Sequence, residues 1–242
     1  MNIVKVDATT STNALAKVLN KDKTENAFCV SAEFQTEGRG QLNSQWQSSR
    51  SENLMFTVVF NDLDLEIENQ FVLNAMVCLR ILKVLKSNNI PNIRFKWPND
   101  ILSDQFKICG ILIENTLNKN LIKSSYVGVG LNVNQSYFEN LPQASSLKNI
   151  IQESVDRHQL LQALIEELET IPEALKTYSP QHIINTYKQN LYNFERDSIF
   201  TLASGESHTG KITDVQLDGK LCVEFKSRKQ SYFNHKEISQ QY

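Results

Sequence analysis

One short segment of the chain, EGRGQ at positions 37–41, places an arginine between two glycines. Glycines let backbone N–H groups approach a ligand closely, and a guanidinium offers five donors in a planar fork that fits a carboxylate or a phosphate. The segment is therefore a candidate anion clamp, formed by Gly38, Arg39, Gly40 and Gln41. A mobile surface loop explains the same residues equally well, because short glycine motifs are weak evidence by themselves.

A lysine inside an apolar run is the second candidate. In FKICGILIE at 106–114, Lys107 is the one polar residue before the final glutamate, and Gly110 follows three positions later. A lysine in such a strand must be paired, reach solvent or serve a function, and a strand glycine often marks the close approach of another group. Lys107 and Gly110 could flank a bound carboxylate; an edge-strand lysine that opposes aggregation is the alternative.

The segment KWPND at 96–100 gathers a cation, an amide and a carboxylate around a proline. Pro98 fixes the backbone, so Lys96, Asn99 and Asp100 stand at the end of a short strand and could contact a polar ligand. Asn and Asp after proline are also ordinary turn residues whose side chains satisfy the local backbone. Taken alone, the segment favours the turn.

Glycines that share one strand face would clear space for a ligand. In VGVGLN at 127–132, alternate residues share a face, so Gly128 and Gly130 would leave room beside Asn132. Close packing of a helix on the sheet explains these glycines as well. Trp46, which follows the glycine-rich segment, is either a core residue or a cover for a flat ligand, and alone the core is favoured.

The segment STN at 11–13 offers Ser11, Thr12 and Asn13 at a predicted helix start, where ordinary N-capping is the favoured explanation and binding of a polar ligand the alternative. No histidine stands near a cysteine or carboxylate at metal-ligand spacing, so we predict no protein-built metal site. The sequence has neither a nucleophile-elbow serine nor a GxxxxGK[ST] loop.

Hydrophobic periodicity predicts the elements that must hold these segments. Strands are expected at 27–34, 54–60, 93–96 and 126–134, with a strand–turn–strand unit at 100–115. Helices are expected at 11–20, 69–89, 156–171 and 180–191; the first would bury Ala14, Leu15, Val18 and Leu19. From about Asp197, short apolar runs separated by turn residues predict a small all-β module. The order favours an α+β fold with a mixed or largely antiparallel sheet.

The composition describes an ordinary globular chain of 242 residues with a net charge of −2. That charge gives no global attraction to nucleic acid or to membranes. Three of the cysteines Cys29, Cys78, Cys109 and Cys222 lie in apolar runs and none forms a CxxC pair, which predicts buried free thiols in a reducing compartment. With no signal peptide and no apolar run long enough to span a bilayer, we expect a cytoplasmic protein without a membrane partner.

Five segments in this order (STN, AEFQTEGRGQ with its tryptophan, KWPNDIL, KICGILIE and VGVGLNVN), followed by a small β module, closely resemble the biotin–protein ligases. The resemblance covers 11–134 in detail and is mainly architectural beyond. It implies a catalytic domain with a fold like the class II aminoacyl-tRNA synthetase core at 1–194 and a C-terminal SH3-like β-barrel at 195–242. It also implies the reaction, in which biotin and Mg·ATP give biotinyl-5′-AMP and a lysine of a biotin carboxyl carrier protein then accepts the biotinyl group.

The resemblance also implies roles for individual residues. Arg39 and Lys107 would be catalytic, stabilising charge on the carboxylate and phosphates. Biotin would contact Ser11, Thr12, Asn13, Gln35, Gly38, Arg39, Gly40, Gln41, Lys107 and Gly110. ATP and the adenylate would contact Arg39, Trp46, Lys96, Asn99, Asp100 and Asn132.

Two departures from the family pattern carry their own expectations. Many members have GRGRRGRxW where this chain has GRGQLNSQW, so Gln41, Leu42 and Asn43 replace two basic residues and a glycine. We hypothesise a weaker hold on ATP or a leakier adenylate. Bifunctional members carry an N-terminal helix-turn-helix, whereas the catalytic motifs here begin within a dozen residues of Met1; we therefore expect a ligase that does not bind DNA as a repressor.

The alternatives are a lipoate–protein ligase, which shares the fold, and a catalytically silent biotin-binding protein. A different glycine-rich signature argues against the first, and the presence of both Arg39 and Lys107 argues against the second. The sequence allows a homodimer without requiring one. It leaves the role of the C-terminal module open, with support of the carrier or of the ATP site favoured.

Overall fold

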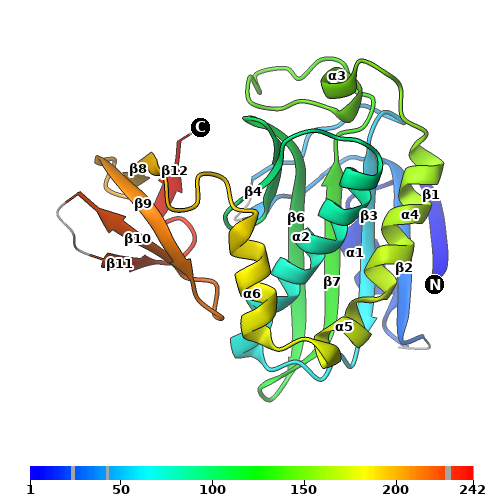
Figure 1. The fold of residues 1–242 in the computed structure, drawn as a ribbon. Helices are drawn as coiled ribbons and strands as arrows, with labels where there is room; N and C mark the ends of the chain where they lie inside the picture. The colour runs from blue at the N-terminus through cyan, green and yellow to red at the C-terminus, as the bar shows by residue number, and fades with distance from the viewer. Residues whose placement is uncertain (23–24, 42–43, 227–229, 242) are drawn as a thin grey trace.

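A computed structural model describes residues 1–22, 25–41, 44–226 and 230–241 (Figure 1). The strands form two sheets that stand side by side, a seven-stranded sheet in the order β1-β2-β3-β7-β6-β5-β4 and a five-stranded sheet in the order β11-β10-β9-β8-β12. In the large sheet β1 pairs with β2 in parallel and every other neighbouring pair is antiparallel. The prediction of an α+β fold with a mixed sheet is confirmed.

The strands of the large sheet coincide closely with the predicted ones. Their bounds are β1 (Asn2–Thr9), β2 (Ala27–Gln35), β3 (Leu54–Asn61), β4 (Ile93–Lys96), β5 (Asp100–Ser103), β6 (Phe106–Asn118) and β7 (Leu121–Leu131). The edge strand β1 was not expected. Its polar and apolar residues give a weak pattern because it borders only β2 and is mostly exposed or half-buried along its length.

Helices cover both faces of the large sheet. In Figure 1, α2 (Gln70–Ser87), α4 (Arg157–Glu169) and α6 (Pro180–Gln189) lie in front of the sheet and α1 (Thr12–Leu19) lies behind it. The front layer buries a large apolar cluster that includes Phe56, Leu73 and Ile81, whereas α1 covers a small cluster around Ala16 and Val30. The short helices α3 (Leu147–Ile151) and α5 (Ile171–Thr177) and the 3₁₀ turn Ile67–Asn69 complete the layer; the sequence showed none of the three as a separate element.

The buried face of α1 differs from the predicted one. Ser11 caps the helix through a 3.1 Å bond from the Ala14 N–H, as expected, but Val18 and Leu19 are 56% and 45% exposed. The helix instead turns Thr12, Asn13 and Ala16 toward the sheet. Polar residues occupy the buried side because the strands beneath offer a buried threonine hydroxyl as their partner.

The five-stranded sheet is the predicted C-terminal β module and is barrel-like in shape. It consists of β8 (Asp197–Leu202), β9 (Ser207–Val215), β10 (Leu221–Phe225), β11 (Gln230–Phe233) and the unexpected β12 (Ile238–Gln240). The Trp97 indole donates to the Gly219 carbonyl at 2.8 Å, and Gly219, with φ +91°, lies so close to Phe71 that a Cβ would sit 2.7 Å from its ring. This contact joins the small sheet to the turn that opens β5. The division of the chain at 194/195 stays a prediction.

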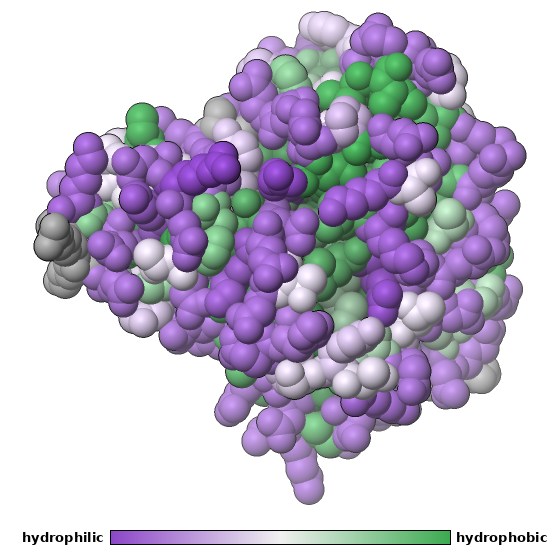
Figure 2. Space-filling view, viewed as in Figure 1, coloured by the Kyte–Doolittle hydropathy of each residue, from purple (hydrophilic) through white to green (hydrophobic). Residues whose placement is uncertain are grey.

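All four cysteines are buried and free, as predicted. Burial raises the pKa of the Cys29 thiol to about 12, so that thiol stays protonated and unreactive. Among the described residues, no helix is both long and apolar enough to cross a bilayer. The helix-bearing face in Figure 2 is mostly hydrophilic, with hydrophobic residues gathered toward its upper part below α3.

Candidate active site

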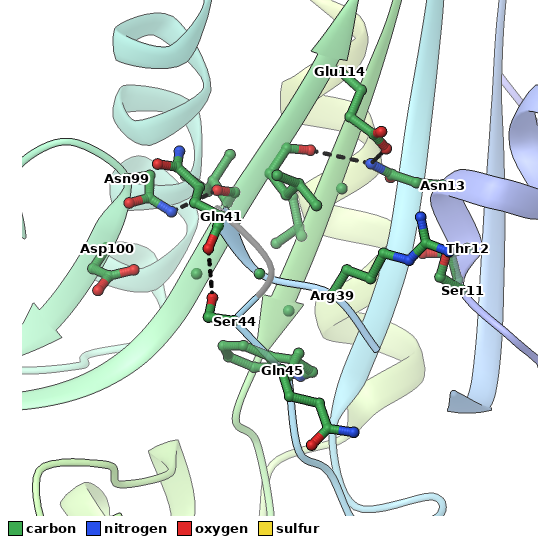
Figure 3. Close-up of a pocket in the computed structure, with 18 of the residues that line it drawn as sticks. Ser11, Thr12, Asn13, Arg39, Gln41, Ser44, Gln45, Asn99, Asp100 and Glu114 are labelled. Atoms are coloured by element: carbon green, nitrogen blue, oxygen red, sulfur yellow. Dashed lines mark hydrogen bonds between the residues drawn. The ribbon is translucent and has the colours of Figure 1, made fainter. Parts of the chain in front are cut away.

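A cavity of about 240 Å³, called here the main cavity, opens at the α1 side of the large sheet (Figure 3). Most of the predicted site residues line it, although they come from segments up to 99 positions apart. These are Ser11, Thr12, Asn13, Gln35, Arg39, Gly40, Gln41, Trp46, Asn99, Asp100, Lys107 and Gly110. The five sequence segments thus converge on a single place in the fold.

The sheet register explains why the glycines converge there. Gly110 lies opposite Asp100 on β5 and opposite Gly130 on β7, so these three residues form a row across the sheet. In the next row, Gly128 lies between Leu112 and Thr57. The two rows form the floor of the main cavity, and because their glycines have no side chains, other groups can lie directly on that floor.

The floor glycines also admit two particular side chains. A Cβ on Gly128 would lie 2.5 Å from the Asn13 Oδ1, and a Cβ on Gly130 would lie 2.4 Å from the Trp46 ring. The strand glycines therefore allow α1 to pack closely on the sheet and also make room for the cavity. The alternatives that the sequence left open for this strand both hold.

One end of the main cavity is built from neutral hydrogen-bonding groups. The Thr12 N–H and hydroxyl donate to the Gln35 Oε1 at 2.7 and 3.2 Å. The Thr57 hydroxyl lies 2.8 Å from the Thr12 hydroxyl and 2.7 Å from the Asn13 Oδ1. Because Ser11, Thr12 and Asn13 are almost fully buried, these groups are fixed in place before a ligand arrives.

Glu114 closes this polar end, and the sequence gave no prediction for it. Its carboxylate accepts from the Asn13 Nδ2 at 2.7 Å and pairs with the Lys17 Nζ at 2.6 Å. Burial acts to raise the pKa of Glu114, but the bonds from Lys17 and Asn13 outweigh it and hold the pKa below its usual value. The signal that could have found Glu114 is its place on the Gly110 face of β6, four residues along the strand.

The other end of the main cavity carries charge. The Lys107 Nζ lies 2.7 Å from the Asp100 Oδ1 and 5.7 Å from the centre of the Trp46 ring. The Lys107 backbone is fixed as well, since its N–H donates to the Gln143 carbonyl at 2.7 Å and its carbonyl accepts from the Ser145 N–H at 3.0 Å. The lysine of the apolar strand is therefore paired and points into a cavity, rather than lying on a free edge.

Arg39 lies on the glycine-rich loop above the floor. The loop doubles back on itself, because the Trp46 N–H donates to the Gly38 carbonyl at 3.0 Å and the Gly40 N–H to the Ser44 carbonyl at 2.7 Å. In Figure 3, the exposed Arg39 side chain extends toward Ser11 and Thr12. The predictions for Leu42 and Asn43 lie outside the described residues.

Gly38, Lys96 and Asn132 are not among the residues that line the main cavity. Gly38 is buried under the loop, where a Cβ would lie 2.5 Å from the Trp46 carbonyl. Lys96 is the first residue of the KWPND segment and is half-buried; burial lowers its pKa to about 8, against the raising effect of Asp100.

Asn132 lines a second cavity of about 330 Å³, the outer cavity, which lies beyond Trp46. Its Nδ2 donates to the Ser145 carbonyl at 3.0 Å, whereas its buried Oδ1 has no partner among the described residues. Trp46 and Lys107 line both cavities, so the indole ring stands as a partition between them. Trp46 is thus a packed residue and a cavity wall at the same time.

The KWPND turn is held from several sides. The Pro98 carbonyl accepts from the Asn74 Nδ2 at 2.8 Å and from the Tyr187 hydroxyl at 3.2 Å. The Asn99 Nδ2 donates to the Ile111 carbonyl at 2.8 Å, so this side chain supports the turn as well as lining the main cavity. The residues of KWPND thus form a turn, as one interpretation of the sequence had it, and Asn99 and Asp100 also line the main cavity, as the other had it.

The C-terminal sheet contributes His235 and Lys236 to the rim of the main cavity. No local residue pattern predicts this, because their place depends on how the two sheets pack. Within the described part of the chain, no three His, Cys, Asp or Glu residues are grouped so as to hold a metal ion.

Comparison with known proteins adds a family and a fold. The model of the biotin/lipoate A/B protein ligase family matches residues 4–132. The biotin–[acetyl-CoA-carboxylase] ligase of Mycobacterium tuberculosis is 26% identical over 233 residues, which cover 94% of this chain and 84% of that protein. The bifunctional ligase/repressor of Bacillus subtilis is 26% identical over 66% of this chain, but the match spans only 50% of that protein.

Solved structures share the whole architecture. A biotin protein ligase of Aquifex aeolicus, in complex with biotin and ATP, has a TM-score of 0.81 at 22% identity, covering 99% of this chain and 98% of that one. A biotin protein ligase of Leishmania major, in complex with biotin, has a TM-score of 0.68 at 21% identity, covering 96% and 98%. At this identity the likeness establishes the fold, including the pair of sheets.

Proposed function

This chain belongs to the biotin/lipoate A/B protein ligase family, and on that premise we propose that it activates biotin with ATP as biotinyl-5′-AMP and passes the biotinyl group to a carrier lysine. That it is a ligase follows from the family. The observation that carries the choice of substrate is the polarity of the main cavity. Fixed hydroxyl and amide groups, with Arg39 beside them, lie at one end, and the Lys107–Asp100 pair lies at the other.

The neutral end suits the uncharged ureido group of biotin, which has both donors and an acceptor. Hydroxyl and amide groups of Ser11, Thr12, Asn13 and Gln35 would bind it, Gly128 would let the Asn13 amide lie close to the floor, and Gly110 would leave room for the ring. The carboxylate would then lie near Lys107, whose ammonium offsets negative charge as a carboxylate oxygen attacks the α-phosphorus of ATP and pyrophosphate leaves. Arg39, whose exposed side chain extends toward Ser11 and Thr12 in this structure, would turn toward Lys107 to bind the phosphates.

The outer cavity is the proposed place of the nucleoside. Trp46 offers an apolar ring face, and the Asn132 Oδ1 is a buried acceptor without a partner among the described residues. In this proposal, Lys96 and Asp100 would lie between the nucleoside in the outer cavity and the phosphates. ATP enters as its Mg²⁺ complex, in which the ion neutralises phosphate charge and keeps waters and phosphate oxygens as ligands.

The acceptor is proposed to be a lysine of a biotin carboxyl carrier protein. The proposed ligase is not a repressor, and the net charge of −2 supports this because DNA-binding surfaces are usually basic. The four buried free thiols favour the reducing cytoplasm as its compartment.

The deciding experiment incubates the protein with Mg·ATP, a carrier domain and either biotin or lipoate, and reads the carrier by mass. The proposal expects one biotinyl group on one carrier lysine and no lipoyl product. Lipoyl transfer would assign the lipoate branch of the family instead. If the protein binds biotin but neither carrier product nor pyrophosphate forms, it is a silent binding protein.

Substituting Gly128 with alanine should weaken biotin binding. The new Cβ would lie 2.5 Å from the Asn13 Oδ1, so the amide must move and lose its bonds to Thr57 and Glu114. We expect the KM for biotin to rise about tenfold with kcat changed less, the sign of a lost binding contact. Steady-state kinetics test this; Gly205→Ala, at a turn with open space around it, should lower stability and leave the KM unchanged.

Substituting Gln41 with arginine should slow release of the adenylate. Gln41 lines the main cavity, where an added guanidinium could reach the adenylate phosphate. Because the loop is open to solvent, we expect only about fivefold slower dissociation of biotinyl-5′-AMP, with less biotinylation of bystander proteins. Gln159→Arg adds the same charge on the exposed surface of α4 and controls for net charge. Equal release from wild type and Gln41→Arg would contradict the leak hypothesis.

A further inference from the structure

His235 stands on a tight turn that follows β11. The Asn234 N–H donates to the Glu237 Oε2 at 2.6 Å, and the Glu237 N–H returns a bond to the Asn234 carbonyl at 3.1 Å. The imidazole meets the Trp97 ring edge-on, with 5.8 Å between centroids and an angle of 89°. In Figure 1 this segment, in red, lies on the side of the small sheet that faces the body. The turn thus holds one imidazole against the KWPND segment.

A third cavity leads from this imidazole to solvent. This intersheet groove, of about 200 Å³, is lined from the body by Asn74, Trp97 and Pro98 and from the small sheet by Asp218 and Gly219. His235 and Gln41 line both the groove and the main cavity, so the two spaces meet between them.

The intersheet groove gives an approach to the reacting carbon that neither proposed ligand fills. Biotin would occupy the main cavity and the nucleoside the outer cavity beyond Trp46, whereas the groove meets the main cavity at Gln41 and His235. An acceptor amine on the end of a lysine side chain would therefore pass His235 before it reaches the acyl carbon. At neutral pH that amine arrives as an ammonium, which cannot attack until it loses a proton.

We propose that His235 is the base of the transfer step, accepting a proton from the acceptor ammonium where the intersheet groove meets the main cavity. The inference rests on the proposed function. The ammonium gives its proton to an imidazole nitrogen, and the freed amine attacks the acyl carbon of biotinyl-5′-AMP. The new C–N bond forms as the C–O bond to the phosphate breaks, AMP leaves with that electron pair, and the amide nitrogen loses its second proton to water.

The surroundings of His235 suit this role. The imidazole is exposed on its turn, and partial desolvation by its neighbours lowers its pKa against the raising effect of Asp100, so the neutral form that accepts a proton is favoured at pH 7. Asp100 is a poorer candidate, since its carboxylate is already paired with Lys107 at 2.7 Å. The charged groups that share the two cavities or the turn with His235 are Arg39, Asp100, Lys107, Glu114, Asp218, Lys220, Lys236 and Glu237.

The test separates the two half-reactions in wild type and in His235→Gln. Adenylate formation is followed by biotin-dependent pyrophosphate exchange, and transfer by single turnover of preformed biotinyl-5′-AMP with a carrier domain. We expect exchange within about twofold of wild type and transfer about 10²-fold slower at pH 6.5. Wild-type transfer should level off above about pH 7, whereas the variant should keep rising about tenfold per pH unit to pH 9, because its amine must arrive already neutral.

The controls make each outcome decisive. His208 lies on β9, where its ring contacts Phe225 away from the main cavity. The control variant His208→Gln should therefore change neither half-reaction. Equal transfer rates in wild type and His235→Gln, parallel pH profiles, or an equal fall in exchange and transfer would overturn the role of His235 as a base. If wild type itself forms no adenylate or transfers nothing, the proposed function fails, whatever the variant does.

Discussion

Replacing Lys107 with alanine should lower kcat/KM for adenylate formation about 10³-fold, the largest catalytic loss that the site predicts. The ammonium lies 2.7 Å from the Asp100 carboxylate at the charged end of the main cavity, next to the glycine that leaves room for the carboxylate of biotin. Because negative charge gathers there as carboxylate and phosphate meet, a fixed cation stabilises the transition state more than either reactant alone. We therefore expect kcat to fall more than the KM for biotin rises.

The Lys107→Ala substitution could also lower activity for a second reason. Removing the ammonium leaves the Asp100 carboxylate, only 19% exposed, without its ion-pair partner. Part of the loss could then come from repulsion between Asp100 and the substrate carboxylate. Comparing Lys107→Ala with the double variant Lys107→Ala/Asp100→Asn separates the two causes, because relief of repulsion would restore activity in the double variant.

Two further variants complete the comparison. Lys107→Arg keeps the charge with a different shape and should retain more activity than Lys107→Ala. Lys211→Ala removes an exposed lysine whose nearest carboxylate, on Asp197, is 3.9 Å away, and it should behave as wild type. Pyrophosphate exchange within tenfold of wild type in Lys107→Ala would remove Lys107 from the chemistry. The protein would then act on biotin through Arg39 alone or only bind it.

Most residues that line the main cavity could be singled out from the sequence because they break local rules. Lys107 is a charge in an apolar strand, and Gly110, Gly128 and Gly130 are glycines in strand interiors. Sequence physics cannot say whether such an exception serves packing or binding, and here several serve both: Gly128 admits Asn13 as well as clearing the cavity floor. The order of the five segments along the chain favoured binding over packing. Each segment by itself either favoured an ordinary structural role or left the two roles equally supported.

The residues that the sequence missed depend on tertiary contacts. His235 reaches the main cavity only because Gly219 and Trp97 join the small sheet to the body, and no local pattern encodes that contact. The exposure of Val18 and Leu19 is a similar case, because the residues that α1 buries are decided by the polar groups of the strands beneath it. Periodicity correctly predicted a helix there, but the face that it predicted to be buried was wrong.

Replacing Tyr187 with alanine should cost about 3–5 kcal/mol of the free energy of unfolding, the largest stability loss that we predict. The side chain is fully buried, stacked on Phe95 at 5.1 Å and edge-on to Phe71 at 5.5 Å. Alanine would leave a cavity between α6, α2 and β4, and for a chain of this length Tm should fall by roughly 10 °C. Urea titration and thermal melts measure both quantities.

Tyr187 also tests how the core supports the site. Burial raises the pKa of its hydroxyl well above the usual value, so the hydroxyl stays a donor to the Pro98 carbonyl, which Asn74 also bonds. Tyr187→Phe should therefore cost only about 1 kcal/mol, while Tyr178→Ala, at an exposed tyrosine, should cost less than that. If Phe and Ala prove equally costly, the hydroxyl rather than the ring supports the turn. A second outcome concerns the site. If Tyr187→Ala still folds at 20 °C but has a raised KM for ATP, then the buried packing behind Pro98 helps to position Asn99 and Asp100.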